Sequence, residues 1–422
     1  MAKVRKLSWP GAPDGLSRAD RRPCEYEAYL PDLLIGRPYM LDGEVAAIVA
    51  GAEAAVAQLD RSAVGLASTE TLARILLRAE AVASSQIEGL AVGARRLVRA
   101  QVMRGEGERG DVTAAEVIAN IDALDWGIGQ VRPGEAIGLN LILGVHERLM
   151  EGTRMHPTGG RLRDVQNWLG GSGFNPCRAA YVPPPPAYVA GLMDDLVTFM
   201  NTDDLPPLMQ AAIAHAQFET VHPFVDGNGR TGRAVIAMVL RRRGVATRVV
   251  PPISLVLATF AEEYVGALGA FRHRGPVDRR SAREAENTVV RFFAASCARA
   301  VADAMLYEQK IDELRSGWRT RLGPIRAGSA TQLLVDAIPG APVLTVGGAA
   351  RLIGRSLPAT NDAITRLVDS GILKQITLGR RNRAFEAADV IDAFAQLERR
   401  LASPAADTRI SPPGRAVPPR GR

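Results

Sequence analysis

The sequence predicts a mainly α-helical protein with one small β-hairpin and a small separate domain towards the C-terminus. Three observations support this fold class. Aromatic residues make up only 5% of the chain, while Ala, Arg and Gly are plentiful, which favours helices over sheets. Apolar residues recur at spacings of three and four over most of the chain. One long stretch, residues 156–186, is instead rich in glycine and proline and predicts a loop or hairpin over a pocket.

The first half of the chain predicts an extended N-terminal segment followed by helices. The N-terminal segment is rich in Pro, Arg and Gly, and we expect it to be extended or partly disordered until it docks. Helical patterning then covers two blocks, and helices resume after the hairpin region. The blocks are 42–90, most regular at 71–87, and 112–151, broken at 127–134; the later helices are 187–202, 208–221 and 229–243.

In the second half, helical patterning continues from the prolines at 251–252 to about residue 322. Residues 328–401 then predict a helix, a short strand, two helices, a hairpin and a final helix. The last twenty residues hold five prolines and predict a disordered tail. The expected regions are an N-terminal segment (1–40), a helical region (41–111), a catalytic core (112–262), a helical linker (263–327), a C-terminal domain (328–402) and the tail (403–422).

Charge and cysteine usage limit the class of protein. The net charge of +7 comes from the two ends, since residues 1–22 carry +4 and residues 403–422 carry +3. The body between them is neutral, so the total does not indicate a nucleic-acid-binding body. Three cysteines match no CxxC pattern and cannot all pair, which favours a reducing compartment. Without a signal peptide or an apolar run of about 20 residues, we expect a soluble cytoplasmic protein that contacts no membrane.

The segment HPFVDGNGRTGR, residues 222–233, carries the most chemistry. Gly227 and Gly229 allow backbone N–H groups to turn inward around Asn228, at the start of the next helix, where the helix dipole favours an anion. Arg230 and Arg233 share a face of that helix, and cations at a helix N-terminus make sense where an anion is bound. Together with one carboxylate, these groups suit a polyphosphate with Mg²⁺.

Two residues of this segment add chemistry to the anion site. Asp226 is the carboxylate that can hold the metal ion, and His222 can accept a proton from an attacking hydroxyl. The alternative is a loop with a capping Asp, turn glycines and two solvated arginines, but that reading does not account for so many functional groups in twelve residues. No GxxxxGK[ST] segment occurs, so the nucleotide chemistry is not of the P-loop type.

The segment 222–233 resembles the signature of the Fic family, HxFx[D/E]GNGRxxR, at every signature position. Members have a compact helical domain and usually transfer AMP from ATP to a Ser, Thr or Tyr hydroxyl of a protein. The resemblance implies His222 as general base and Asp226 as Mg²⁺ ligand. It also implies that ATP is bound by Phe224, Gly227, Asn228, Gly229, Arg230 and Arg233, the last at the γ-phosphate.

Residues 159–186 resemble the family's GxxR…Q…GG…FVPPPP region, which forms a flap that pairs with the target polypeptide by strand addition. The implied docking residues are Arg178, Tyr181 and Val182, with Tyr181 where a Phe is common. The alternative is a surface loop with a polyproline cap. Tyr264 resembles a position near the adenine pocket, although a helical tyrosine is more often part of the core.

Residues 84–89, SSQIEG, resemble the family's inhibitory pattern [S/T]xxxE[G/N]. Ser84 and Glu88 are four apart and share a helix face, and Gly89 is well placed to end the helix. A carboxylate in the last turn opposes the helix dipole, so a cationic partner is expected. The resemblance implies that Glu88 pairs with Arg233 and blocks productive ATP binding; a solvated glutamate is the alternative. In some relatives the same glutamate supports removal of AMP.

Residues 341–387 resemble a winged helix-turn-helix, with Ile353, Ala363, Ile364, Leu367 and Ile372 expected in its core. Wing-tip arginines Arg380, Arg381 and Arg383 can reach phosphates. Over residues 341–396 the net charge is only +2, which favours a protein-interaction or dimer-positioning role over DNA binding.

The function expected from the sequence is therefore a protein adenylyltransferase autoinhibited by Glu88. ATP, Mg²⁺ and a protein substrate docked on the flap are its expected partners, and family resemblance implies a homodimer. The alternatives are a DNA-binding winged-helix regulator with a nucleotide-sensing domain and a de-AMPylating hydrolase.

Overall fold

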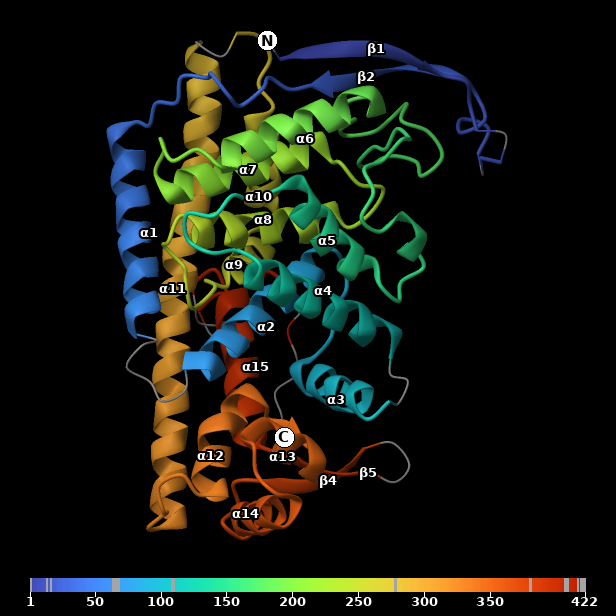
Figure 1. Ribbon diagram of the computed structural model, residues 1–422. Coiled ribbons are helices and arrows are strands. Elements are labelled where there is room, and N and C mark those ends of the chain that lie inside the picture. Colours follow the sequence, from blue (N-terminus) through green and yellow to red (C-terminus); the bar gives the residue numbers. More distant parts are fainter. Residues whose placement is uncertain are drawn as a thin grey trace. The chain divides into compact units, whose positions relative to one another are not determined.

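The computed structural model describes residues 2–12, 14–15, 17–62, 69–107, 111–276, 279–378, 382–405, 410–415 and 417. Helices dominate, and the strands of these residues form two small sheets (Figure 1). The chain divides into two compact units: unit 1 is Met1–Glu53, Trp126–Gly244 and Glu262–Ala295, and unit 2 is Ala54–Asp125, Val245–Ala261 and Ser296–Arg422. The regions expected to be consecutive are therefore interleaved, because a helix buries its apolar face on whichever segment fits it.

Unit 1 begins with a two-stranded antiparallel sheet. Strand β1 (Lys3–Trp9) pairs with β2 (Cys24–Leu30), in a register that places Lys3 opposite Leu30 and Trp9 opposite Cys24. The sequence predicts an extended segment here but not the strand pairing. A disulfide joins Cys24 to Cys177, and the third cysteine, Cys297, is buried. The sequence did not predict this pair, and the expected reducing compartment stays a prediction.

The core of unit 1 consists of helices around α7 (Pro207–Val221). Every residue of α7 from Leu208 to Val221 is buried, as expected for a helix of mostly small and apolar residues packed on all sides. Its neighbours include α8 (Asn228–Arg242), which follows directly after a short loop. The other helices that lie wholly or mostly in unit 1 are α5 (Leu139–Met150), α6 (Pro186–Met200) and α10 (Ala261–Phe271).

Three further helices contribute residues to both units. Helix α1 (Gly43–Ser62) continues through Gly51, because a single glycine costs a helix only about 1 kcal/mol. Helix α4 (Val112–Gly129) matches the start of the second predicted block. Helix α11 (Arg280–Leu322) is one continuous helix of 43 residues.

Unit 2 contains α2 (Thr69–Ile87), α3 (Ala94–Gly105) and α9 (Ile253–Thr259). Helix α3 was not expected from the sequence. Helices α2 and α9 are joined by Glu80, whose buried carboxylate accepts a hydrogen bond of 2.8 Å from the Ser254 N–H and another from the Ser254 hydroxyl. Buried carboxylates require such partners.

The C-terminal part of unit 2 has the element order expected for a winged helix. Its elements are α12 (Ala330–Ala337), η3 (Ile338–Gly340), β3 (Val343–Leu344), α13 (Val346–Ile353), α14 (Leu357–Asp369), β4 (Lys374–Leu378), β5 (Asn382–Glu386) and α15 (Ala388–Ala402). The three strands form an antiparallel sheet in the order β3-β5-β4. Of the expected core residues, Ile353 is partly exposed and the other four are buried.

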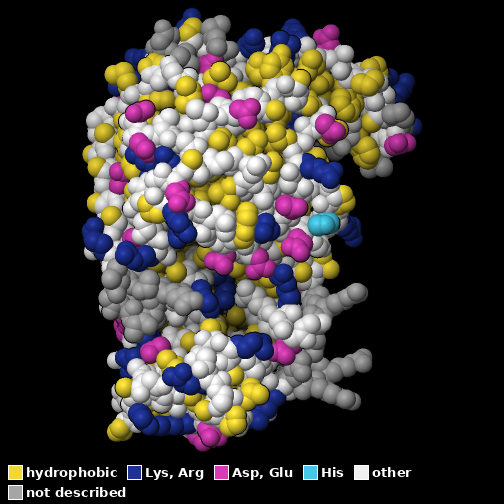
Figure 2. Space-filling view, in the orientation of Figure 1, with side chains coloured by type: hydrophobic (Ala, Val, Ile, Leu, Met, Phe, Trp, Pro, Cys, Tyr) yellow, Lys and Arg dark blue, Asp and Glu magenta, His cyan; other side chains and the backbone are white. Residues whose placement is uncertain are grey.

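The wing of this module was expected to present three arginines. Arg380 and Arg381 lie outside the described residues, while Arg383 is exposed and its guanidinium carbon lies 4.9 Å from the centre of the Phe385 ring. Over the described part of the face in Figure 2, basic and acidic side chains are interspersed.

The tail was expected to be disordered, and the described part of it is not. The Gly414 N–H donates to the Ala402 carbonyl at 2.8 Å, and Arg415 Nη1 donates to Gln86 Oε1 at 2.8 Å. Backbone and side-chain hydrogen bonds thus tie this segment to unit 2 despite its proline content. Among the described residues, no single helix is both long enough and apolar enough for a membrane span; α9 and α10 meet that test only when taken together across a 98° bend.

Candidate functional site

The segment 222–228 connects α7 to α8 in unit 1. Helix α7 ends at His222, which adopts the left-handed conformation with φ 50° and ψ 61°. It is the one non-glycine residue with positive φ in the described parts of the chain. Such a conformation costs of order 1–3 kcal/mol and is found where the surrounding structure enforces it, often at functional sites.

Arg163 holds the backbone at His222 in place. Its Nε donates to the His222 carbonyl at 2.8 Å, and its Nη2 donates to the carbonyls of Pro184 (2.6 Å) and Val221 (3.2 Å). Nη1 donates to the Val165 carbonyl at 3.1 Å. Burial lowers the pKa of Arg163 to about 10, so it stays charged at neutral pH. Its four carbonyl acceptors compensate the buried charge and orient the loop.

Asn167 and Asn228 fix the loop from its other side. Asn167 Nδ2 donates to the Phe224 carbonyl at 3.0 Å and to the His222 carbonyl at 3.3 Å. Asn228, the first residue of α8, accepts from the Phe224 N–H and donates to the Phe224 carbonyl, both at 2.8 Å. The peptide groups on both sides of Phe224 are therefore bonded by side chains, which leaves the loop little conformational freedom.

The side chain of His146 on α5 contacts this loop through its ring face and its ring nitrogens. Its ring stacks on the buried Phe224 ring with centroids 3.7 Å apart and planes 7° apart. Nε2 lies 3.0 Å from the Asp226 carbonyl, and Nδ1 accepts from the Gly160 N–H at 3.0 Å. Burial lowers the pKa of His146 to about 4, which agrees with a neutral ring that carries its proton on Nε2. Phe224, expected at the ATP site, is fully buried and anchors the loop.

Gly227 and the start of α8 lie where the sequence predicts an anion site, and that role stays a prediction. Gly227 has φ 73°, and its N–H donates to Asp226 Oδ1 at 2.7 Å. A Cβ at this position would lie 2.6 Å from Met150 Cε, so both the conformation and the space require glycine. Arg230 and Arg233 are both buried in the first turns of α8. Arg230 Nη2 lies 3.9 Å from Asp226 Oδ2.

The imidazole of His222 lies close to the end of α7. Its Nδ1 is 3.8 Å from Glu219 Oε2, and the two side chains are 14% and 10% exposed. This separation is too long for a direct hydrogen bond. A Cβ at Gly232 would lie 2.6 Å from Glu219 Oε1, so a glycine in α8 makes room for this carboxylate beside the histidine.

The donor set suits a magnesium ion that is shared with a ligand. The Asp226 side chain is 53% exposed and offers carboxylate oxygens, the ligands that Mg²⁺ prefers. Across the described ranges, no group of three or more His, Cys, Asp or Glu side chains is placed to hold a metal ion. Mg²⁺ at Asp226 would therefore depend on phosphate oxygens and water for its other ligands, as it does in many nucleotide sites.

The expected flap differs from a regular hairpin. Residues 159–186 contain one isolated bridge between Leu169 and Tyr181, and no strand among them. The prolines at 183–186 lack the N–H groups that would extend the pairing. The Tyr181 hydroxyl donates to the Thr220 carbonyl at 2.6 Å, and Val182 is buried with its carbonyl bonded to the Tyr29 N–H at 2.9 Å. Arg178 is exposed. The docking role of these residues stays a prediction.

Tyr264 on α10 lies in the core of unit 1. It is 4% exposed, and its hydroxyl lies 2.8 Å from Nε2 of the buried His215. Its ring also contacts the rings of Phe292 and Phe293. This is the core position that the sequence left open as the alternative to a place at the adenine pocket.

The residues of the expected inhibitory motif lie at the end of α2, in unit 2. Ser84 is buried and Glu88 is exposed, one residue beyond the end of the helix. Gly89 has φ 82°, as expected for a residue that terminates a helix. Asn120 Nδ2 donates to Ser85 Oγ at 3.0 Å and fixes this last turn. The expected pairing of Glu88 with Arg233 joins the two units and stays a prediction.

Sequence reasoning missed the residues that position the loop. Arg163 lies within the quoted GxxR pattern, so a signal for it was present without a role. No signal in the sequence pointed to His146 or Asn167. A lone histidine on an apolar helix, or an asparagine in a glycine-rich loop, has the same appearance in the sequence whether its role is structural or functional. Their importance follows from the carbonyls that they meet at residues 222–226.

A buried helix, a loop held by side chains and a second helix therefore make up the candidate site, within a mainly helical unit. Residues 136–240 match the model of the Fic/DOC family, and residues 47–129 match the family's N-terminal model. These segments therefore form a Fic/DOC family domain and a Fic N-terminal domain, distantly related to protein adenylyltransferases.

Relatives of known sequence and structure agree with this assignment. Protein adenylyltransferase fic-1 of Caenorhabditis elegans is 32% identical over 168 residues, which is 38% of this chain and 30% of that protein. Protein adenylyltransferase Fic of Drosophila grimshawi is 35% identical over 119 residues, or 27% and 22% of the two chains. This chain thus spans less than a third of the length of these curated relatives.

One solved structure supports the fold over most of the chain. It is a Fic family protein from Desulfovibrio desulfuricans, with 20% sequence identity and a TM-score of 0.50, and the match covers 83% of this chain and 98% of that one. At this identity the likeness shows the mainly helical Fic fold alone.

Proposed function

We propose that this protein transfers AMP from ATP to a Ser, Thr or Tyr hydroxyl of a protein. The observation that carries the proposal is the left-handed His222 at the end of the buried helix α7, with its carbonyl bonded by Arg163 and Asn167. Strain at one histidine, enforced by the buried Arg163 and the partly buried Asn167, is expected where an imidazole must be held for reaction. Distant homology to protein adenylyltransferases supports the same reaction.

In the proposed reaction, His222 accepts the proton of the target hydroxyl as its oxygen attacks the α-phosphorus of ATP. The new bond joins that oxygen to phosphorus, the bond from the α-phosphorus to the bridging oxygen breaks, and pyrophosphate leaves. The Gly227–Gly229 backbone and the buried Arg230 and Arg233 hold the phosphates. Asp226 would hold Mg²⁺, which supplies positive charge to the phosphate oxygens.

We further propose that Glu88 restrains this activity. Its place directly after α2, with Ser85 fixed by Asn120, gives the carboxylate a defined anchor point. Removal of the glutamate should therefore raise AMP transfer by orders of magnitude, as expected when a carboxylate competes with a phosphate for an arginine.

Labelled-ATP transfer tests both proposals. The full chain and its Glu88→Gly variant are incubated with Mg²⁺ and ATP labelled on the α-phosphate, alone and with lysate proteins. We expect strong labelling by Glu88→Gly, and its loss by a factor of about 10²–10⁴ when His222→Ala is added. His156→Ala, a change at an exposed histidine outside the loop, is the matched control and should keep full labelling.

Each outcome of this experiment has a consequence. Labelling that is unchanged by His222→Ala would contradict the role of the histidine as general base. No increase in Glu88→Gly would contradict the inhibitory role of Glu88. Loss of AMP from a modified protein, seen with wild type but not with Glu88→Gly, would assign the de-AMPylating activity instead.

A further inference from the structure

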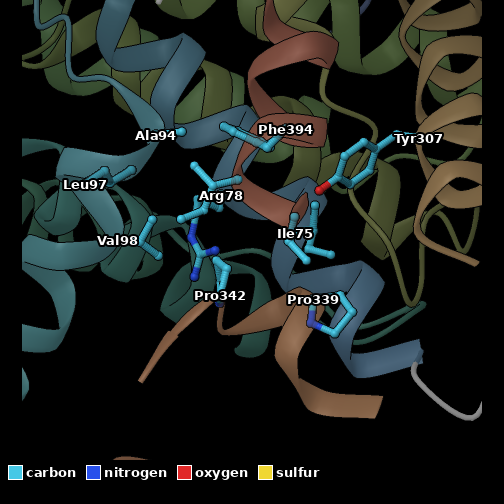
Figure 3. A pocket seen from close by; sticks show the side chains of 11 residues that line it. Ile75, Arg78, Ala94, Leu97, Val98, Tyr307, Pro339, Pro342 and Phe394 are labelled. Carbon is cyan, nitrogen blue, oxygen red and sulfur yellow. The ribbon is translucent and has the colours of Figure 1, made fainter. Parts of the chain in front are cut away.

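A cavity lies within unit 2, away from the segment 222–233 in sequence. Its walls come from α2, α3, α11, α15 and the segment around Pro339 and Pro342 (Figure 3). They are mostly apolar, with Ile75, Leu97, Val98 and Phe394 among them. Two polar side chains line the same cavity, Arg78 from α2 and Tyr307 from α11.

Arg78 is mostly buried and poorly compensated. Its Nε is inaccessible to solvent and has no hydrogen-bond partner within the described residues, and its Nη2 donates one long bond of 3.3 Å to the Gly340 carbonyl. Burial lowers the pKa of Arg78 to about 10, and the charges that act on it are Tyr307 and Arg74, with no carboxylate among them. The guanidinium stays positive at neutral pH, so the cavity holds a cation without a counter-ion from the described chain.

A buried carboxylate of the same unit, that of Glu386, is engaged with other arginines. Glu386 on β5 accepts from Arg99 at 2.8 Å and lies 3.0 Å from Arg95 Nε, both on α3. These contacts satisfy the carboxylate within the same unit. Glu386 is therefore not available as a counter-ion for Arg78.

Tyr307 provides a second group for a ligand. Its side chain is 4% exposed, and its hydroxyl makes no hydrogen bond to any described residue. Figure 3 shows this hydroxyl pointing into the cavity, towards the side that carries Arg78. Burial raises the pKa of Tyr307, so the hydroxyl keeps its proton and can donate it in a hydrogen bond. The hydroxyl is therefore a donor that a ligand in the cavity can use.

We propose that this cavity binds a small monocarboxylate of the size of formate or acetate. Nε and Nη2 of Arg78 form the planar fork that matches two carboxylate oxygens, and the Tyr307 hydroxyl supplies a further donor. The apolar walls accept the hydrogen or methyl group of the ligand. The cavity is small, at about 20 Å³, which limits the ligand to a few non-hydrogen atoms and excludes a nucleotide.

Binding to the full chain tests this proposal directly. Titration calorimetry and thermal unfolding are carried out with sodium formate, acetate, chloride and nitrate in a carboxylate-free buffer at constant ionic strength. We expect formate or acetate to bind with 1:1 stoichiometry and to raise Tm, and chloride and nitrate to act at least about tenfold more weakly, since they lack two oxygens bound to an apolar carbon.

Variants separate the proposed site from general salt effects. Arg78→Lys keeps the charge but lacks the planar fork, so carboxylate affinity should fall by at least about tenfold in a folded protein. Tyr307→Phe should weaken binding severalfold. Arg326→Met removes an exposed arginine of the same unit and should leave binding unchanged. Circular dichroism confirms that each variant is folded.

Two results would overturn the proposal. The first is equal binding or stabilisation by acetate and chloride, which would make Arg78 a general anion contact. The second is an unchanged acetate affinity in both Arg78→Lys and Tyr307→Phe, which would place any binding elsewhere. Because neither readout involves AMP transfer, failure here and failure of the proposed activity are distinguishable.

Discussion

Two buried arginines in the two units show how differently the same charge can be accommodated. Burial lowers the pKa of both Arg163 and Arg78 to about 10. Arg163 donates to four carbonyls that surround the loop at His222, whereas Arg78 makes one long bond and has a buried Nε without a partner. One cation is part of a complete network that fixes a backbone. The other cation, Arg78, lines a cavity in which it lacks a full set of hydrogen-bond acceptors.

Burial alone does not reveal whether an arginine has a structural or a ligand-binding role. A lowered pKa reports loss of solvent at both arginines, but only the inventory of acceptors separates a structural role from a ligand-binding one. A complete network makes its members costly to remove, since each loss leaves buried acceptors unpaired. In an incomplete network, the removal of a member costs little stability, and an added ligand that completes the network raises the stability.

The largest expected effect is therefore at Arg163. Arg163→Met should destabilise unit 1 by about 4 kcal/mol, because four carbonyls lose a charged donor and only that of His222 keeps another, from Asn167. Trp9, Trp126 and Trp168 lie in unit 1, so denaturant unfolding followed by tryptophan fluorescence reports mainly on it. Arg161→Met, at an exposed neighbour, should cost less than about 0.5 kcal/mol. A loss below about 1 kcal/mol in Arg163→Met would mean that the network is not what holds the loop.

Glu398 in unit 2 gives an expected loss of stability as the pH rises. Burial raises its pKa to about 7, against the nearby charges of Arg415 and Arg399. Because its folded pKa lies above the unfolded value, the contribution is complete below about pH 4.5 and falls by roughly 3 kcal/mol as the pH rises through 7. Hydrogen exchange of α15 peptides between pH 5 and 8, corrected for intrinsic rates, measures it. Glu398→Gln should flatten this dependence, and an equally steep profile in the variant would assign it to another group.

His215 in unit 1 gives the opposite dependence on pH. Burial lowers its pKa to about 3, so the unfolded chain takes up a proton first as the pH falls. The contribution is complete above about pH 6.5 and decreases by roughly 2 kcal/mol between pH 6.5 and 5. Hydrogen exchange of α7 peptides over this range should show the loss, and His215→Gln should reduce it. Parallel pH profiles for α7 and α15 would show that these two residues do not control them.

Gly227 tests the loop itself. Gly227→Ala should cost about 2 kcal/mol, because φ is positive and the added methyl would meet Met150 Cε at 2.6 Å. Gly173→Ala is the matched control, at an exposed glycine with open space around it and ordinary φ, and should change stability by less than about 0.5 kcal/mol. Equal effects from the two substitutions would show that the backbone at 227 is not under constraint.

The smallest effect is expected at Arg78. Without ligand, Arg78→Met should change stability by less than about 1 kcal/mol or raise it, since it removes a buried charge that lacks a counter-ion. Thermal unfolding of both proteins in carboxylate-free buffer measures the difference. A loss of several kcal/mol would show that Arg78 is as well compensated as Arg163 and would remove the contrast between the two units.

Much of the local structure was predictable from the sequence. Helices α2, α6, α7 and α8 lie close to the expected ranges, because each combines a regular apolar spacing with a Pro or Gly at its end. The winged-helix order was confirmed for the same reason. Helix α3 was missed, since its arginine-rich sequence carries a weak apolar signal, and the β1–β2 pairing was missed because each strand is short and its partner lies beyond a polar loop.

The sequence by itself determined the chemistry of the loop at 222–233, because twelve neighbouring residues place a histidine, a carboxylate, turn glycines and two arginines at one helix start. It could not determine which distant groups would hold that loop. Arg163 and His146 come from segments about 60 to 80 residues away, Cys24 pairs across 153 residues, and the Arg78 cavity draws on five separate segments. Spacing along the chain encodes which residues share a helix face. Which faces meet is decided only when apolar surface is buried and each buried polar group finds, or fails to find, its partner.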